Sequence, residues 1–182
     1  MSLWKATFLL CLLAVFAAAS TGCQRPPRAT VKDYDTYQLV NLGEVRYTTP
    51  EGLRVETRGR GYAVHTVDAH PEIRLRIEVD PNPPRSLRVD AESQQRRFLR
   101  DLGIMASTSV QYSSRHDREI VKYITRGRSG DPDSPYGSLM LIRKEGATAV
   151  LKVTGPLRLR TEMNTLIERM GRHIEFSRLD LM

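Results

Sequence analysis

Residues 73–79 read Ile-Arg-Leu-Arg-Ile-Glu-Val, so four aliphatic side chains alternate with three charged ones. Successive side chains of a β-strand point to opposite faces of the sheet, and only an amphipathic strand explains this period of two well. We expect the aliphatic face to be buried. Arg74 and Arg76 lie on the opposite face, which we expect to be exposed, because a buried guanidinium group needs a partner.

Shorter apolar patterns predict further strands at 45–47, 53–55, 62–64, 110–112, 120–125, 139–143 and 147–154, with a short last strand at 173–176. Tyr62 and Val64 are the apolar positions of the half-buried strand at 62–64. Residues 144–146, Lys-Glu-Gly, provide a tight turn, so 139–143 and 147–154 are expected to form a hairpin. Apolar residues on both faces of 147–154 predict a strand that is buried on both sides.

Two segments have the apolar stripe of an amphipathic helix. The first is 91–102, with Asp90 as the expected N-cap and Gly103 as the stop signal. The second is 157–170, which we expect to end at Gly171. The chain is therefore predicted to have an α+β fold, with a mostly antiparallel sheet covered by at least two helices.

The first 23 residues have the organisation of a bacterial lipoprotein signal. Lys5 precedes an apolar run over 6–19, and Ser20-Thr21-Gly22-Cys23 follows it. We expect cleavage between Gly22 and Cys23 and a diacylglycerol group on the Cys23 thiol. The run is shorter than the roughly 20 residues of a membrane-spanning helix.

An ordinary signal peptidase could instead cut after the Ala-Ala-Ala sequence at 17–19, which would release a soluble periplasmic or secreted protein that starts at Ser20. Under the lipoprotein interpretation, residues 1–22 are the signal peptide, 23–36 a Pro-containing tether and 37–182 one globular domain. Cys23 is then the only cysteine of the mature chain, so no internal disulfide can form. In a Gram-negative host of the enteric type, Gln24 after the cysteine predicts delivery to the outer membrane, with the protein facing the periplasm.

The chain is basic, with a formal net charge of +7, and arginine supplies most of the excess. Its cations are spread singly and in pairs, so we expect no nucleic-acid partner. They are compatible with an anionic glycan or lipid partner. Arg74, Arg76 and Arg128 are the candidate basic surface, the last of them in the expected loop 127–137.

Signature motifs of hydrolases, nucleotide-binding proteins and paired-cysteine sites are absent from the mature sequence. No metal or cofactor is expected. The leading hypothesis is therefore a non-enzymatic lipoprotein of the cell envelope that binds a protein or glycan. The alternative is an extracytoplasmic hydrolase or metal-dependent enzyme with a dispersed active site, for which the candidate residues are His65, His70, His116, Asp131 and Asp133, with Asp68 as a further possible metal ligand.

The expected order of elements resembles that of the PsbP-like α/β/α sandwich, a family that includes the photosystem II extrinsic protein and the DcrB lipoproteins. The resemblance covers about residues 44–177: N-terminal strands, a helix near Arg96, antiparallel strands ending in a hairpin, an amphipathic helix and a last short strand. It implies a non-catalytic adaptor that docks on a membrane-associated partner, and it carries no functional residue over to this chain.

Overall fold

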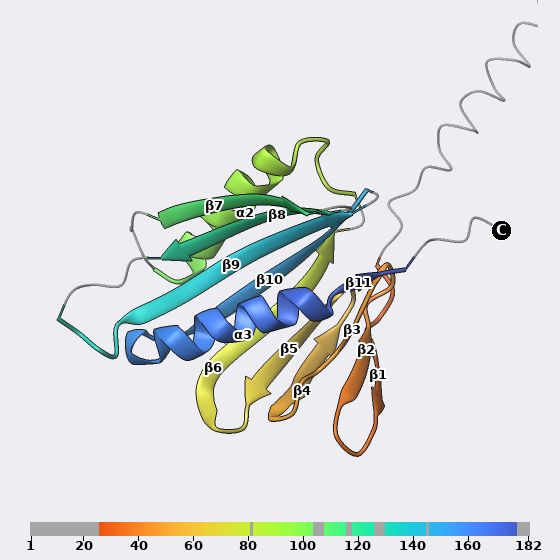
Figure 1. The fold of residues 1–182 in the computed structure, drawn as a ribbon, viewed down its shortest axis with the longest axis horizontal. Helices are drawn as coiled ribbons and strands as arrows, with labels where there is room; N and C mark the ends of the chain where they lie inside the picture. Colours follow the sequence, from red (N-terminus) through yellow and green to blue (C-terminus); the bar gives the residue numbers. More distant parts are fainter. Residues whose placement is uncertain are drawn as a thin grey trace, which may run out of the picture.

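The computed structural model describes residues 26–80, 82–103, 108–115, 118–125, 130–144 and 146–177. In that part of the chain two antiparallel sheets are combined with two α-helices (Figure 1). The larger sheet has the strand order β4-β5-β6-β10-β9-β8-β7 and the smaller sheet the order β1-β2-β3-β11. The predicted α+β class is confirmed.

The strands of the larger sheet are β4 (Leu53–Gly59), β5 (Tyr62–Val67), β6 (His70–Asp80), β7 (Thr108–Arg115), β8 (Arg118–Thr125), β9 (Pro135–Lys144) and β10 (Ala147–Pro156). The strands of the smaller sheet are β1 (Thr30–Asp33), β2 (Gln38–Asn41), β3 (Val45–Thr48) and β11 (Glu175–Phe176). The helices are α2 (Leu87–Asp101) and α3 (Arg160–His173), and a 3-10 turn, η1 (Leu157–Leu159), precedes α3.

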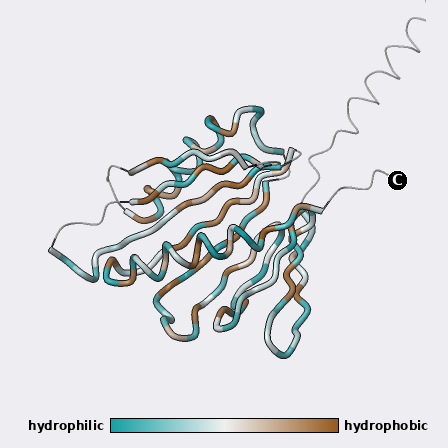
Figure 2. Tube along the Cα trace, in the orientation of Figure 1, coloured by the Kyte–Doolittle hydropathy of each residue, from teal (hydrophilic) through white to brown (hydrophobic). Residues whose placement is uncertain are grey.

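The predicted hairpin is formed by β9 and β10, with Ala147 opposite Lys144 and Gly146 at φ 89° in the turn. β10 also pairs with β6, where Leu151 lies opposite Ile77. Seven consecutive residues of β10 are buried because helices cover both faces of the sheet here. Figure 2 shows the hydrophobic colouring concentrated in these central strands.

The two helices pack on opposite faces of the larger sheet. Alternate residues of β9 enter different cores: Leu139 and Leu141 pack with Phe98 of α2, whereas Met140 and Ile142 belong to the core that includes Ile167 of α3. The smaller sheet lies on the α3 side, because its Val40, Val45 and Tyr47 belong to that second core, together with Leu42 between β2 and β3. The larger sheet is therefore a central layer, with α2 on one face and α3 and the smaller sheet on the other.

Both helices have other boundaries than expected. α2 begins at Leu87, after the extended Ser86, and Asp90 is not its N-cap but a buried residue of its first turn, paired with Arg143. α3 continues past Gly171 to His173. A Cβ atom at Gly171 would lie 2.7 Å from Sδ of Met140, so this glycine lets the helix approach β9 closely and does not end it.

The face of β5 that enters the core also differs from the prediction. Ala63 and His65 are the buried residues, whereas Tyr62 and Val64 are only half-buried, on the other face. Two interactions favour this orientation: the Tyr47 hydroxyl gives the buried imidazole a hydrogen-bond partner, and the Arg76 guanidinium lies over the Tyr62 ring.

The described chain is bound into the fold from its first residues. The backbone N–H of Ala29 donates to the carbonyl of Gly59 at 2.8 Å, and that of Gly61 donates to Pro27 at 2.9 Å. β1 then pairs with β2. Residues 26–36 of the predicted tether therefore belong to the domain, which begins earlier than residue 37. In the described part, no helix is both long enough and apolar enough to cross a membrane.

Candidate binding surfaces

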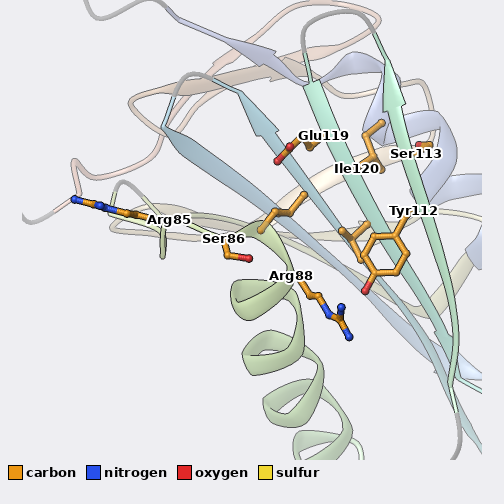
Figure 3. A pocket seen from close by; sticks show the side chains of 9 residues that line it. Arg85, Ser86, Arg88, Tyr112, Ser113, Glu119 and Ile120 are labelled. Atoms are coloured by element: carbon orange, nitrogen blue, oxygen red, sulfur yellow. The ribbon is translucent and has the colours of Figure 1, made fainter.

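An open cleft of about 470 Å³ lies between the start of α2 and strands β7 and β8 (Figure 3). Figure 3 shows Arg88 of α2 and Tyr112 of β7 on its two sides. Leu87 and Ile120 add apolar surface, and Arg85 adds a cation. Arg88 also forms an exposed ion pair with Glu92 at 3.1 Å. Glu119 also lines the cleft, which therefore combines apolar surface with two cations and one carboxylate.

The β7 wall of this cleft is an edge strand. Among the described strands, β7 has β8 as its only neighbour, so the backbone groups along its other side have no strand partner. Val110 and Tyr112 point to the α2 side, since they lie opposite Tyr123 and Val121 of that core. Both are exposed, Tyr112 by 60%. An open edge with exposed apolar side chains is a surface to which an extended peptide can add as a further strand.

A buried ion pair holds the start of α2 against the sheet beside the cleft. The Arg143 guanidinium donates to Oδ2 of Asp90 at 2.9 Å, to Oγ1 of Thr148 at 3.0 Å and to the carbonyl of Arg85 at 3.3 Å. Burial raises the pKa of the Asp90 carboxyl, and the charge of Arg143 opposes this shift. The pair fixes the position of Arg85 and hence one side of the cleft.

A second cavity, of about 530 Å³, lies between the β1–β2 and β3–β4 turns. Its lining includes the acidic residues Asp33, Asp35, Glu51 and Asp68, and the rings of Tyr34 and Tyr37 stack beside them at 4.8 Å. Arg54 pairs with Asp68 at 3.1 Å. Across the described ranges, histidine, cysteine and acidic side chains form no group of three that could hold a metal ion.

Arg74 and Arg76 are exposed, as predicted, and the aliphatic face of β6 is buried. Each arginine has a carboxylate beside it on the same sheet: Glu56 lies 2.9 Å from Arg74, and Glu78 pairs with Arg76. These acids offset much of the positive charge of the expected basic surface. Arg128, its third member, lies outside the described residues.

The described candidates for a dispersed active site do not share one site. His65 is buried in the core, where Nε2 and the Tyr47 hydroxyl are 2.7 Å apart, and burial lowers its pKa to about 4. Asp131 and Asp133 are exposed before β9, and Asp133 forms an ion pair with Arg158 at 2.8 Å. His70 starts β6. His116, Gly22 and Cys23 lie outside the described residues.

Comparisons with known proteins bear on the fold. No family model matches the chain, and no curated protein matches it. The solution structure of cyanobacterial PsbP (CyanoP) from Synechocystis sp. PCC 6803 superposes with a TM-score of 0.53 at 10% identity, over 86% of this chain and 95% of that one. The chain has a PsbP-like fold. The resemblance expected from the order of elements is thus supported at the level of the fold.

Two further structures were found at lower similarity. A protein of Bacteroides thetaiotaomicron matches with a TM-score of 0.47 at 11% identity, over 75% of this chain and 46% of that one. LpqN, described as involved in cell envelope biogenesis of Mycobacterium tuberculosis, matches with a TM-score of 0.36 at 12% identity, over 86% and 87%.

Sequence reasoning missed the cleft. Residues 85–88, 112–113 and 119–121 line it, and only the tertiary structure brings them together. One signal was present: Val110 and Tyr112 alternate with polar residues in a strand that carries little other apolar surface. Asp90 correctly marks the region where α2 begins. Helix-capping preference, however, predicts that Asp90 is the N-cap and gives no sign of its buried ion pair with Arg143.

Proposed function

We propose that the chain is a non-catalytic lipoprotein of the bacterial cell envelope, anchored by lipid on Cys23, which binds an envelope protein in the cleft between α2 and β7. The observation that carries this proposal is the juxtaposition of the open β7 edge with a cleft whose lining combines apolar side chains with Arg85, Arg88 and Glu119. The PsbP-like fold is compatible with this role, and the signal sequence supports export.

The cleft defines the chemistry of the proposed partner. An extended segment would hydrogen-bond to the backbone of β7 and place an apolar side chain against Tyr112 and Leu87. An acidic side chain of the same segment would meet Arg88 beside Tyr112, and Arg85 adds positive charge at the other side of the cleft, so the interaction is selective for charge. The partner is thus a protein with an acidic, apolar-containing segment.

The anchor is tested by substituting the cysteine. Cys23→Ser should abolish lipid attachment, because serine cannot form the thioether, and the protein should move to the aqueous phase or remain unprocessed. Detergent-phase partitioning and mass spectrometry of the N-terminal peptide measure both results. A wild-type protein that begins at Ser20 without acyl mass would exclude the anchor and leave a soluble protein.

The cleft is tested by site-specific crosslinking in cells. A photoreactive phenylalanine analogue in place of Tyr112 keeps the ring and should crosslink one envelope protein. The matched control is the same analogue at Tyr37, which is also exposed but lies at the acidic cavity. The Tyr112 product should disappear when Arg85 and Arg88 are replaced by glutamate. Identical products from both positions, or a product insensitive to the charge reversal, would contradict a partner site in the cleft.

A further inference from the structure

We propose that Arg28 and Arg60 form a binding site for the anionic phospholipid headgroups of the membrane that carries the protein. This inference rests on the proposed anchor at Cys23, and it adds a second, electrostatic contact that orients the domain. The site lies where the described chain begins, beside the end of β4.

The backbone places the two arginines directly opposite each other. They form an isolated antiparallel bridge, flanked by the hydrogen bonds from Ala29 to Gly59 and from Gly61 to Pro27. These flanking bonds make Arg28 and Arg60 a non-hydrogen-bonded pair, the arrangement in which opposite side chains approach most closely, on the same face. Ala29 is buried, so the alternation of side chains directs Arg28 outward.

Neither arginine of this pair has an ion-pair partner among the described residues; the nearest acidic residues in the backbone contacts are Glu44, next to Gly43 at Pro27, and Asp80, next to Val79 at Gly61. Both side chains belong to exposed residues, and no described carboxylate forms an ion pair with either. The same holds for exposed Arg58, two residues before Arg60 on β4. By contrast, Arg54 at the other end of β4 pairs with Asp68. Like charges directly opposite on paired strands are destabilising, so an external anion would relieve the repulsion between Arg28 and Arg60.

The site is also close to the proposed lipid. Pro26, the first described residue, is three residues from Cys23 and packs at Gly61, where a Cβ atom would be 2.8 Å from Cβ of Pro26. Since an extended chain spans at most about 3.6 Å per residue, Pro26 lies within about 11 Å of the cysteine Cα. An acylated Cys23 would therefore hold Arg28 and Arg60 near the headgroups, where an anionic surface attracts arginine.

The opposite end of the smaller sheet has the opposite charge. Thr30 pairs with Asn41 at the end near Arg28, whereas Asp33 pairs with Gln38 at the far end. Asp33 lines the acidic cavity. Docking through Arg28 and Arg60 would turn this cavity away from an anionic membrane, so attraction at one end and repulsion at the other favour the same orientation.

The experiment uses the full chain, purified from cells that process it and reconstituted into vesicles of phosphatidylcholine, with or without phosphatidylglycerol. Arginines are labelled with phenylglyoxal and quantified by mass spectrometry. We expect labelling of Arg28 and Arg60 to fall several-fold in the anionic vesicles and to recover at high salt. Arg54, whose side chain is 74% exposed, should be labelled equally in both. Equal labelling of Arg28 and Arg60 in both vesicles would overturn the proposal.

The same samples separate this inference from the proposed anchor. If the N-terminal peptide carries no acyl mass, the anchor is wrong, and the soluble protein is sedimented with the same vesicles. Replacing Arg28 and Arg60 by glutamine should then weaken binding to the anionic vesicles on the order of thirtyfold. The control with Arg97→Gln and Arg160→Gln removes the same charge from α2 and α3 and should bind as wild type. Absence of phosphatidylglycerol-dependent binding, or equal weakening in the control, would overturn the headgroup site.

Discussion

His65 shows how a single residue couples the stability of this fold to pH. Its ring lies between the two sheets with no exposed surface, and Nδ1 has no hydrogen-bond partner among the described groups. The Tyr47 ring meets the imidazole edge-on, with the ring centroids 5.6 Å apart. Burial disfavours the charged imidazolium and lowers the pKa of His65 from 6.5 to about 4, and it also raises the pKa of Tyr47.

This shift predicts loss of stability in mild acid. Between pH 6.5 and 4 the unfolded chain binds the His65 proton more readily than the folded chain does, so the free energy of unfolding falls as the pH falls. Above pH 6.5 the titration of His65 does not lower the free energy of unfolding. Near pH 4 it has lowered this free energy by about 3 kcal/mol. Urea unfolding over this range measures the change.

His65→Gln is the matched variant, because its side-chain amide can still form a hydrogen bond with the Tyr47 hydroxyl but does not titrate. The difference in unfolding free energy between wild type and variant should narrow towards pH 4, while the carboxylates contribute equally to both. A difference that stays constant with pH would show that His65 does not cause the acid sensitivity.

Removing one partner of the Asp90–Arg143 pair should lower the free energy of unfolding more than removing both partners. The side chain of Asp90 is 3% exposed and that of Arg143 11% exposed. Asp90→Ala leaves a buried guanidinium without its carboxylate, which should lower the free energy of unfolding by about 3 kcal/mol. Asp90→Leu combined with Arg143→Met removes both charges and should restore much of the loss. If the double variant is the less stable one, the pair contributes more through its other hydrogen bonds than through its charge.

At the scale of elements, β6 gives a direct test of its two faces. Leu75 has no exposed surface, so Leu75→Ala should lower the free energy of unfolding by about 2 to 5 kcal/mol through the cavity it leaves. Arg74→Gln with Arg76→Gln should change it by only about 0.5 kcal/mol per site, because both ion pairs are partly exposed. Denaturant unfolding of both variants decides between the faces. Equal destabilisation would contradict the orientation of this strand.

Two glycines allow the packing of each helix against the larger sheet to be tested separately. A Cβ atom at Gly137 would lie 2.6 Å from the Phe98 ring of α2 and 2.9 Å from the backbone carbonyl of Val153, so Gly137→Ala should destabilise by about 1 to 3 kcal/mol. At Gly171 the nearest atom is the movable Sδ of Met140, and alanine gains up to about 1 kcal/mol of helix propensity. Gly171→Ala should therefore unfold at the higher urea concentration of the two. The reverse order would show that α3 is packed more rigidly than α2.

Elements with a long alternation of apolar and polar residues, or with a clear turn sequence, could be predicted from the sequence. Short strands, and a strand whose buried face carries a polar residue, could not. The alternation in residues 73–79 and the Lys-Glu-Gly turn located β6 and the β9–β10 hairpin correctly. β1, inside the predicted tether, and β2, at the start of the predicted domain, have four residues each, too few for an alternation to stand out. The buried face of β5 was misassigned because a polar His65 enters the core only through its contact with Tyr47, on a strand of the other sheet.

For the whole molecule, sequence predicted the layers but not the surfaces. An antiparallel sheet with two amphipathic helices has few ways to bury its apolar residues, and the PsbP-like arrangement is one of them. The cleft at β7, the acidic cavity and the Arg28–Arg60 pair each combine residues that are distant in the chain. Periodicity carries no information about such contacts, because they depend on which strands become neighbours.

The pairing of β11 with β3 sets the order in which the domain can be completed. Glu175 and Arg46, 129 positions apart, face each other across this pair, so closing the smaller sheet needs almost the whole chain. Pairings of such long sequence separation form slowly. During synthesis, β3 lacks its second neighbour until Glu175 and Phe176 have been made, so the smaller sheet is closed after all the other described strands have been synthesised.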